Sequence, residues 1–73
     1  MTRDEWIADF ARALGVPPPD AGTVETLLDL AGTAAHASER TAAPIACYLV
    51  GLAGAAPADA GRLAEAVAPA PED

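Results

Sequence analysis

Apolar side chains recur at three- and four-residue spacing near the N-terminus, which predicts an amphipathic first helix. Thr2 and Glu5 have the T-x-x-E spacing of a capping box, so this helix is expected to begin there. Gly15 suits a helix C-cap, and the prolines at 17–19 cannot continue a helix, so residues 15–22 are expected to form a stiff linker. The buried face of the helix is predicted to hold Trp6, Ile7, Phe10, Ala13 and Leu14.

A second amphipathic helix is predicted over residues 23–39. Its apolar stripe consists of Val24, Leu27, Leu28, Ala31, Ala34 and Ala35. The positions opposite that stripe hold Glu25, Asp29, Gly32, His36 and Arg40. This arrangement is typical of a helix with one face against a core and the other in water.

Two prolines mark the starts of two further helices, since the missing N–H of proline would be unpaired in the first turn anyway. The third helix is predicted over residues 44–53 and the fourth over residues 57–67. No alternation typical of a β-strand is visible. The expected fold is all-α, a compact bundle of three to four short helices. It forms one domain over residues 1–68, and residues 69–73 are predicted to be a disordered tail.

The length and the net charge of the chain limit the classes of function that it can have. The chain has 73 residues, enough for one small domain, and its eleven acidic residues against four arginines give a net charge of −7. Nucleic acids and anionic membranes are bound chiefly through basic side chains, so neither is expected as a partner. The chain has one cysteine, Cys47, and an acidic N-terminus unlike a signal peptide, so we expect a cytoplasmic location.

The predicted third helix is apolar on all sides, and such a helix must be surrounded. In one interpretation the other three helices enclose it. In the other, a face of small residues stays open and packs closely against a second chain. The larger side chains of the helix are Ile45, Tyr48, Leu49 and Leu52. The face of small residues, our predicted partner interface, consists of Cys47, Val50, Gly51 and Gly54.

Few residues offer candidate chemistry. His36 has Asp29 two turns earlier and Arg40 one turn later, a spacing that would let Asp29 orient His36 while Arg40 binds an anion. The alternative is a solvated helix face without a ligand. A single histidine with carboxylates rarely fills a zinc shell, so no metal site is expected. There is no phosphate-binding glycine loop and no convergent acid, base and nucleophile. We therefore expect no enzyme activity, no catalytic residue and no resident cofactor.

Several short segments carry a resemblance to a known family. They are Asp4-Glu5-Trp6-Ile7, Leu28-Asp29-Leu30-Ala31 with His36 and Glu39-Arg40, and Ala42-Ala43-Pro44 with Leu49-Val50-Gly51-Leu52. Over residues 4–52 the chain resembles a small actinobacterial domain of unknown function that is associated with molybdopterin-guanine dinucleotide biosynthesis. That domain occurs alone or appended to a molybdenum cofactor guanylyltransferase of the MobA type. The chain departs from the family's usual residues at Gly32-Thr33 and Ile45-Ala46-Cys47.

The resemblance implies an accessory role in molybdenum cofactor biosynthesis or molybdoenzyme maturation, and not the nucleotidyl transfer itself. The partner it implies is a molybdenum cofactor guanylyltransferase or a maturation factor. Two alternatives stay open. One is a small-ligand binder in which His36, Arg40 and Asp29 hold the phosphate or pterin part of a cofactor. The other is a homodimer that uses its apolar face for self-association.

Overall fold

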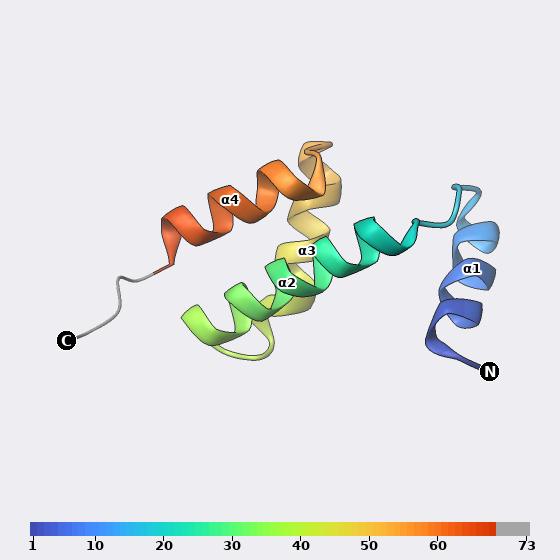
Figure 1. The fold of residues 1–73 in the computed structure, drawn as a ribbon, viewed down its shortest axis with the longest axis horizontal. Coiled ribbons are helices and arrows are strands. Elements are labelled where there is room, and N and C mark those ends of the chain that lie inside the picture. The colour runs from blue at the N-terminus through green and yellow to red at the C-terminus, as the bar shows by residue number, and fades with distance from the viewer. Residues whose placement is uncertain (69–73) are drawn as a thin grey trace.

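The computed structural model describes residues 1–68, which form four helices joined by short loops (Figure 1). The helices are α1 (Arg3–Leu14), α2 (Ala21–Ala37), α3 (Ala42–Ala53) and α4 (Pro57–Val67). No strand occurs within these residues, so the predicted all-α class, a compact bundle of short helices, is confirmed. The tail predicted over residues 69–73 lies outside the described residues.

Local signals set both ends of α1, as predicted. The Thr2 hydroxyl accepts a hydrogen bond from the backbone N–H of Glu5 at 3.1 Å. The Glu5 carboxylate accepts one from the backbone N–H of Thr2 at 3.4 Å, which closes the capping box. Gly15 ends the helix at φ +79°, a left-handed conformation that residues with a Cβ rarely adopt.

The boundaries of α2 differ from the prediction at both ends. The helix begins two residues early because the Asp20 carboxylate caps it, accepting a hydrogen bond from the Thr23 backbone N–H at 2.7 Å. It ends at Ala37, so the predicted end at residue 39 is wrong. Ser38 leaves the helical conformation with φ −140° and ψ −100°. Arg40 therefore lies in the loop after α2 and not on the helix.

The two later helices begin near their prolines. Pro44 occupies the first turn of α3, which starts two residues before the predicted position. The first four N–H groups of a helix have no partner inside it, so this proline removes no helical hydrogen bond. Pro57 is the first residue of α4, as predicted. All four predicted helices are therefore present.

The packing is centred on α2. Both α3 and α4 pack against it, and in Figure 1 α4 runs beside α2 while α3 crosses it. The α1 helix lies at one end of the molecule, across the proline linker. The fully buried residues of the described chain are Ala11, Leu30 and Ala60. The core is therefore thin, with one large side chain at its centre.

The predicted buried face of α1 is wrong at its two aromatic residues, and one residue of the apolar stripe predicted on α2 is exposed. Trp6 and Phe10 are 54% and 49% exposed, because α1 lies apart from the packing of α2 with α3 and α4. On α2, Leu28 belongs to the predicted apolar stripe but is 52% exposed, whereas Leu30 lies outside the stripe and is 2% exposed. The neighbouring helices thus decide which side of α2 becomes core.

Candidate functional site

The exposed large apolar side chains define the candidate site. Twelve such residues are exposed, against three fully buried residues in the described chain. Contiguous exposed apolar patches often mark places where another molecule binds. Nine of the twelve fall into two groups. We call them the α1 face, made of Trp6, Phe10 and Leu14, and the α3–α4 face, made of Ile45, Tyr48, Leu49, Leu52, Leu63 and Val67.

The α1 face is built around two stacked aromatic rings. The ring centroids of Trp6 and Phe10 lie 5.0 Å apart, and the ring planes are inclined by 28°. The two residues are four positions apart, a spacing that places side chains above one another on a helix. Charged residues of the same helix border the rings, with Nη1 of Arg12 paired to Oδ1 of Asp9 at 3.0 Å. The α1 face therefore has an apolar centre and a polar border.

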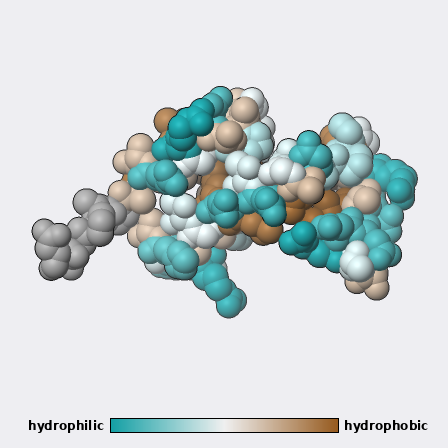
Figure 2. Space-filling view, viewed as in Figure 1, coloured by the Kyte–Doolittle hydropathy of each residue, from teal (hydrophilic) through white to brown (hydrophobic). Residues whose placement is uncertain are grey.

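The α3–α4 face borders an apolar groove of about 330 Å³. The buried Leu30 of α2 lies between its two walls, and no charged residue lines it. Figure 2 shows strongly apolar residues recessed in the middle of the molecule, between more polar surfaces. The walls include Leu49, Val50 and Ala53 from α3 and Leu63, Ala64 and Val67 from α4.

The four residues predicted as a partner interface lie along one side of α3 and its C-cap, but they differ in exposure. Val50 is half-buried and contributes to the α3 wall of the apolar groove. Cys47 is half-buried and lines a different recess, between α2 and the start of α1. Gly51 and Gly54 are exposed, and Gly54 ends α3 at φ +66°. A Cβ added at Gly51 would meet no atom within 4 Å. The interface role of these residues stays a prediction.

Sequence reasoning missed the most exposed side of α3. None of its residues is fully buried, and its four large side chains are 54–68% exposed. The available signal was their spacing of three, four and seven residues, which is typical of a seam between two helices. These residues are Ile45, Tyr48, Leu49 and Leu52.

The structure does not gather the three residues predicted to bind an anionic ligand. Asp29 borders a shallow recess between α2 and α4. His36 is exposed two turns further along α2, a rise of about 10 Å along the helix axis. Arg40 lies beyond the end of the helix. Neither His36 nor Arg40 lines the recess that Asp29 borders. Their ligand role stays a prediction.

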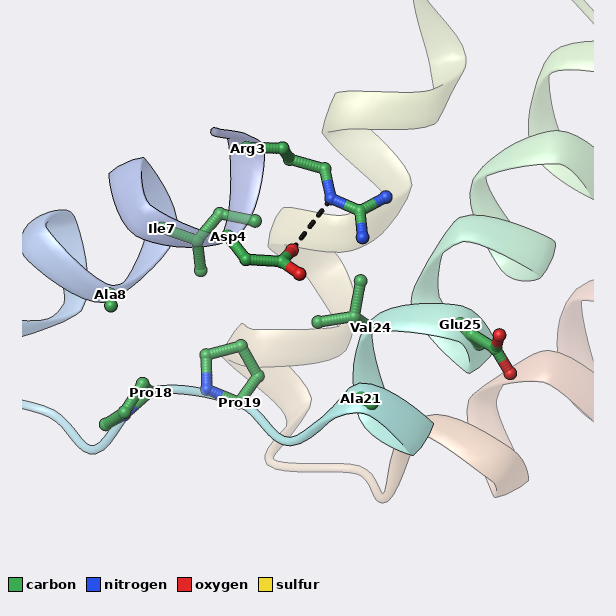
Figure 3. Close-up of a pocket in the computed structure, with 9 residues that line it drawn as sticks. All are labelled: Arg3, Asp4, Ile7, Ala8, Pro18, Pro19, Ala21, Val24 and Glu25. Atoms are coloured by element: carbon green, nitrogen blue, oxygen red, sulfur yellow. Dashed lines mark hydrogen bonds and ion pairs between the residues drawn. The ribbon is translucent and has the colours of Figure 1, made fainter. Parts of the chain in front are cut away.

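Another recess, of about 240 Å³, lies where α1 meets the linker and the start of α2 (Figure 3). The apolar side chains of Ile7, Pro19 and Val24 surround it. At its border, Nε of Arg3 pairs with Oδ1 of Asp4 at 2.9 Å. At this recess α1 meets the linker and the start of α2 through apolar side chains.

Residues 1–68 contain neither a cluster of metal-ligating side chains nor a helix suited to span a membrane. Across residues 1–68, no group of three or more His, Cys, Asp or Glu is placed to hold a metal ion. Over the same span, no helix has both the length and the apolar composition needed to cross a bilayer.

These features define a small all-α domain that leaves most of its large apolar side chains exposed. The chain belongs to the family described as domain of unknown function DUF6457, which it matches over residues 1–72. No curated protein and no solved structure matches it. The description of this family names no activity.

Proposed function

We propose that this chain is a non-catalytic accessory module that binds, through its α1 face, to a protein of molybdenum cofactor biosynthesis or molybdoenzyme maturation. The observation that carries the proposal is the exposure of the stacked Trp6 and Phe10 rings. The partner we favour is a molybdenum cofactor guanylyltransferase. The reason is that segments within residues 4–52 resemble a domain that occurs appended to that enzyme.

The anatomy of the α1 face suits a protein partner. Tryptophan is among the residues that most often dominate the binding energy of protein interfaces, where it fills a pocket on the partner. Stacking on Phe10 holds Trp6 in place, so less conformational entropy is lost when the two rings are covered. The charged border, which includes the pair of Asp9 and Arg12, can set the orientation of the partner.

Charge supports a partner with a basic docking surface. The chain carries a net charge of −7, and complementary charge speeds association and excludes wrong partners. An enzyme that binds phosphate-bearing nucleotides and pterins needs cationic side chains near its site. We therefore expect this association to weaken as the salt concentration rises.

The test is an isothermal titration calorimetry experiment. The purified chain is titrated into the molybdenum cofactor guanylyltransferase of the same organism, and the dissociation constant is measured. Trp6→Ala should weaken binding by roughly thirtyfold or more, as is typical for a hot-spot residue. The matched control is Leu28→Ala, which removes an exposed apolar side chain from α2, outside both apolar faces, and should leave the affinity unchanged. Absence of binding at low salt, or equal losses in the two variants, would overturn the proposal.

Arg40 gives a specific reason to keep the alternative, a binder of small anionic ligands. Arg3, Arg12 and Arg62 each pair with a neighbouring aspartate, whereas Arg40 has no carboxylate partner within the described residues. The discriminating experiment is a titration with a guanine nucleotide as the probe. Nucleotide binding that Arg40→Ala abolishes and Trp6→Ala leaves intact would favour this alternative.

A further inference from the structure

We infer that the α3–α4 face is covered by a second copy of this chain in a two-fold symmetric dimer. This inference goes beyond the proposed function, because it concerns a different surface and a different partner. Every described residue of α3 is at least partly exposed. Yet α3 is the most apolar of the four helices, with no charged side chain between Ala42 and Ala53. A helix of this composition needs apolar neighbours on all sides.

The chain exposes enough surface to supply such an interface. Its accessible surface is 5615 Å², whereas a globular protein of this mass typically exposes about 4,200 Å². The excess is on the order of 1,000 Å², and a stable protein interface requires roughly 800 Å² from each partner. This surplus is counted over the whole chain, α1 included, and is of the size that one dimer contact covers. The distribution of charge then decides where on the chain that contact lies.

The distribution of charge favours a second copy at this face. Two chains that each carry a net charge of −7 repel each other wherever their acidic surfaces meet. The other three helices carry aspartate and glutamate along their length. Only α3 has no charge, so two copies can approach there without bringing carboxylates together. Interfaces of permanent homodimers are also more apolar than those of transient complexes.

The geometry fits a self-complementary contact. Ile45, Tyr48 and Leu52 follow the spacing of a helix–helix seam, and Leu49 extends the seam into the groove beside α4. In a two-fold arrangement each α3 lays this seam across the α3 and α4 of the other copy, so both partners bury the same patch. The interface then consists of α3 and α4 from both copies, with Leu63 and Val67 at its edge.

Sedimentation velocity over a range of concentrations tests the dimer directly. The full chain should sediment at about twice the 7.3 kDa of one copy. Leu52→Glu should raise the dimer dissociation constant by roughly thirtyfold or more, because it places a charge in the seam. Phe10→Glu is the matched control, since it makes the same kind of change on the α1 face. Circular dichroism reports whether each variant keeps its helices.

A cross-linking experiment covers the case in which Leu52→Glu unfolds the chain. In a Cys47→Ser background, Tyr48→Cys should form disulfide-linked dimers under mild oxidation, because residues near a two-fold axis meet their own copy. Glu25→Cys, on the exposed side of α2, should not. A monomeric wild-type chain at 100 µM, on the order of the concentrations at which weak dimers assemble, would overturn the inference. So would a dimer that only Phe10→Glu disrupts, or equal cross-linking of the two cysteine variants.

Discussion

Trp6 stacks on Phe10 with ring centroids 5.0 Å apart, although about half of each residue remains exposed. Such aromatic pairs contribute about 0.5–1.5 kcal/mol beyond area burial. We expect Phe10→Ala to destabilise α1 by about 0.5 kcal/mol, the lower end of this range, because both rings are already partly exposed to water. The fluorescence emission of Trp6, the chain's one tryptophan, should shift to longer wavelength because its indole ring becomes more exposed to water.

Phe10→Leu serves as the control for this prediction, because leucine keeps apolar bulk beside the indole without an aromatic ring. Its emission should stay closer to that of the wild type than the emission of Phe10→Ala does. If Trp6 in the wild type already emits like a fully hydrated indole and neither substitution changes it, the stacked arrangement does not persist in solution.

Leu30 and Leu28 provide a matched test of where the core lies. They are two residues apart on α2, yet Leu30 is 2% exposed and Leu28 is 52% exposed. Leu30→Ala should cost about 2–5 kcal/mol, the range for a buried leucine. Leu28→Ala should change the free energy of unfolding by about 0.5 kcal/mol or less. Urea denaturation followed by circular dichroism measures both.

The loss predicted for Leu30→Ala is comparable to the whole stability of a domain this small, which is rarely above about 3–5 kcal/mol. A substantial unfolded population of that variant is therefore expected at room temperature. Equal midpoints for the two variants would contradict the packing of α3 and α4 on the Leu30 side of α2.

Signals confined to neighbouring residues predicted most of the helix boundaries. The pairing of Thr2 with Glu5 marked the start of α1, and Gly15 marked its end. Pro57 marked the start of α4. These positions were predictable because each depends on backbone groups within a few residues. The predicted start of α2 is wrong because Asp20, which directly follows three prolines, caps the helix through Thr23 and does not extend the linker.

The exposed faces could not be predicted in the same way, because they depend on contacts between helices. The apolar period of α1 indicates that Trp6 and Phe10 share a face, but it does not say whether another helix covers that face. On α3, apolar residues occur on every side, so the seam spacing of its larger residues does not by itself say which side the other helices leave open. Leu52 is exposed only because α3 packs on α2 through its opposite side. The candidate site therefore emerges from tertiary packing.

Asp20 should make the stability of the chain depend on pH. The backbone and side-chain hydrogen bonds from Thr23 hold the pKa of the Asp20 carboxyl below its usual range. Because the pKa is lower in the folded state, the unfolded chain binds more protons near that pKa. The stabilisation is therefore fully present above the unfolded pKa of an aspartate and is lost as the pH falls through the lower folded pKa.

Thermal unfolding of the wild type, Asp20→Asn and Asp20→Ala across the acidic range isolates this contribution. Asparagine keeps a cap oxygen for the Thr23 N–H but does not titrate there, so Asp20→Asn should lose less stability on acidification than the wild type. Asp20→Ala lacks the cap at every pH, so it should melt below both at neutral pH. The other ten acidic residues are common to all three proteins, so differences between their pH profiles report on Asp20. Parallel profiles for the wild type and Asp20→Asn would show that the cap contributes no pH dependence.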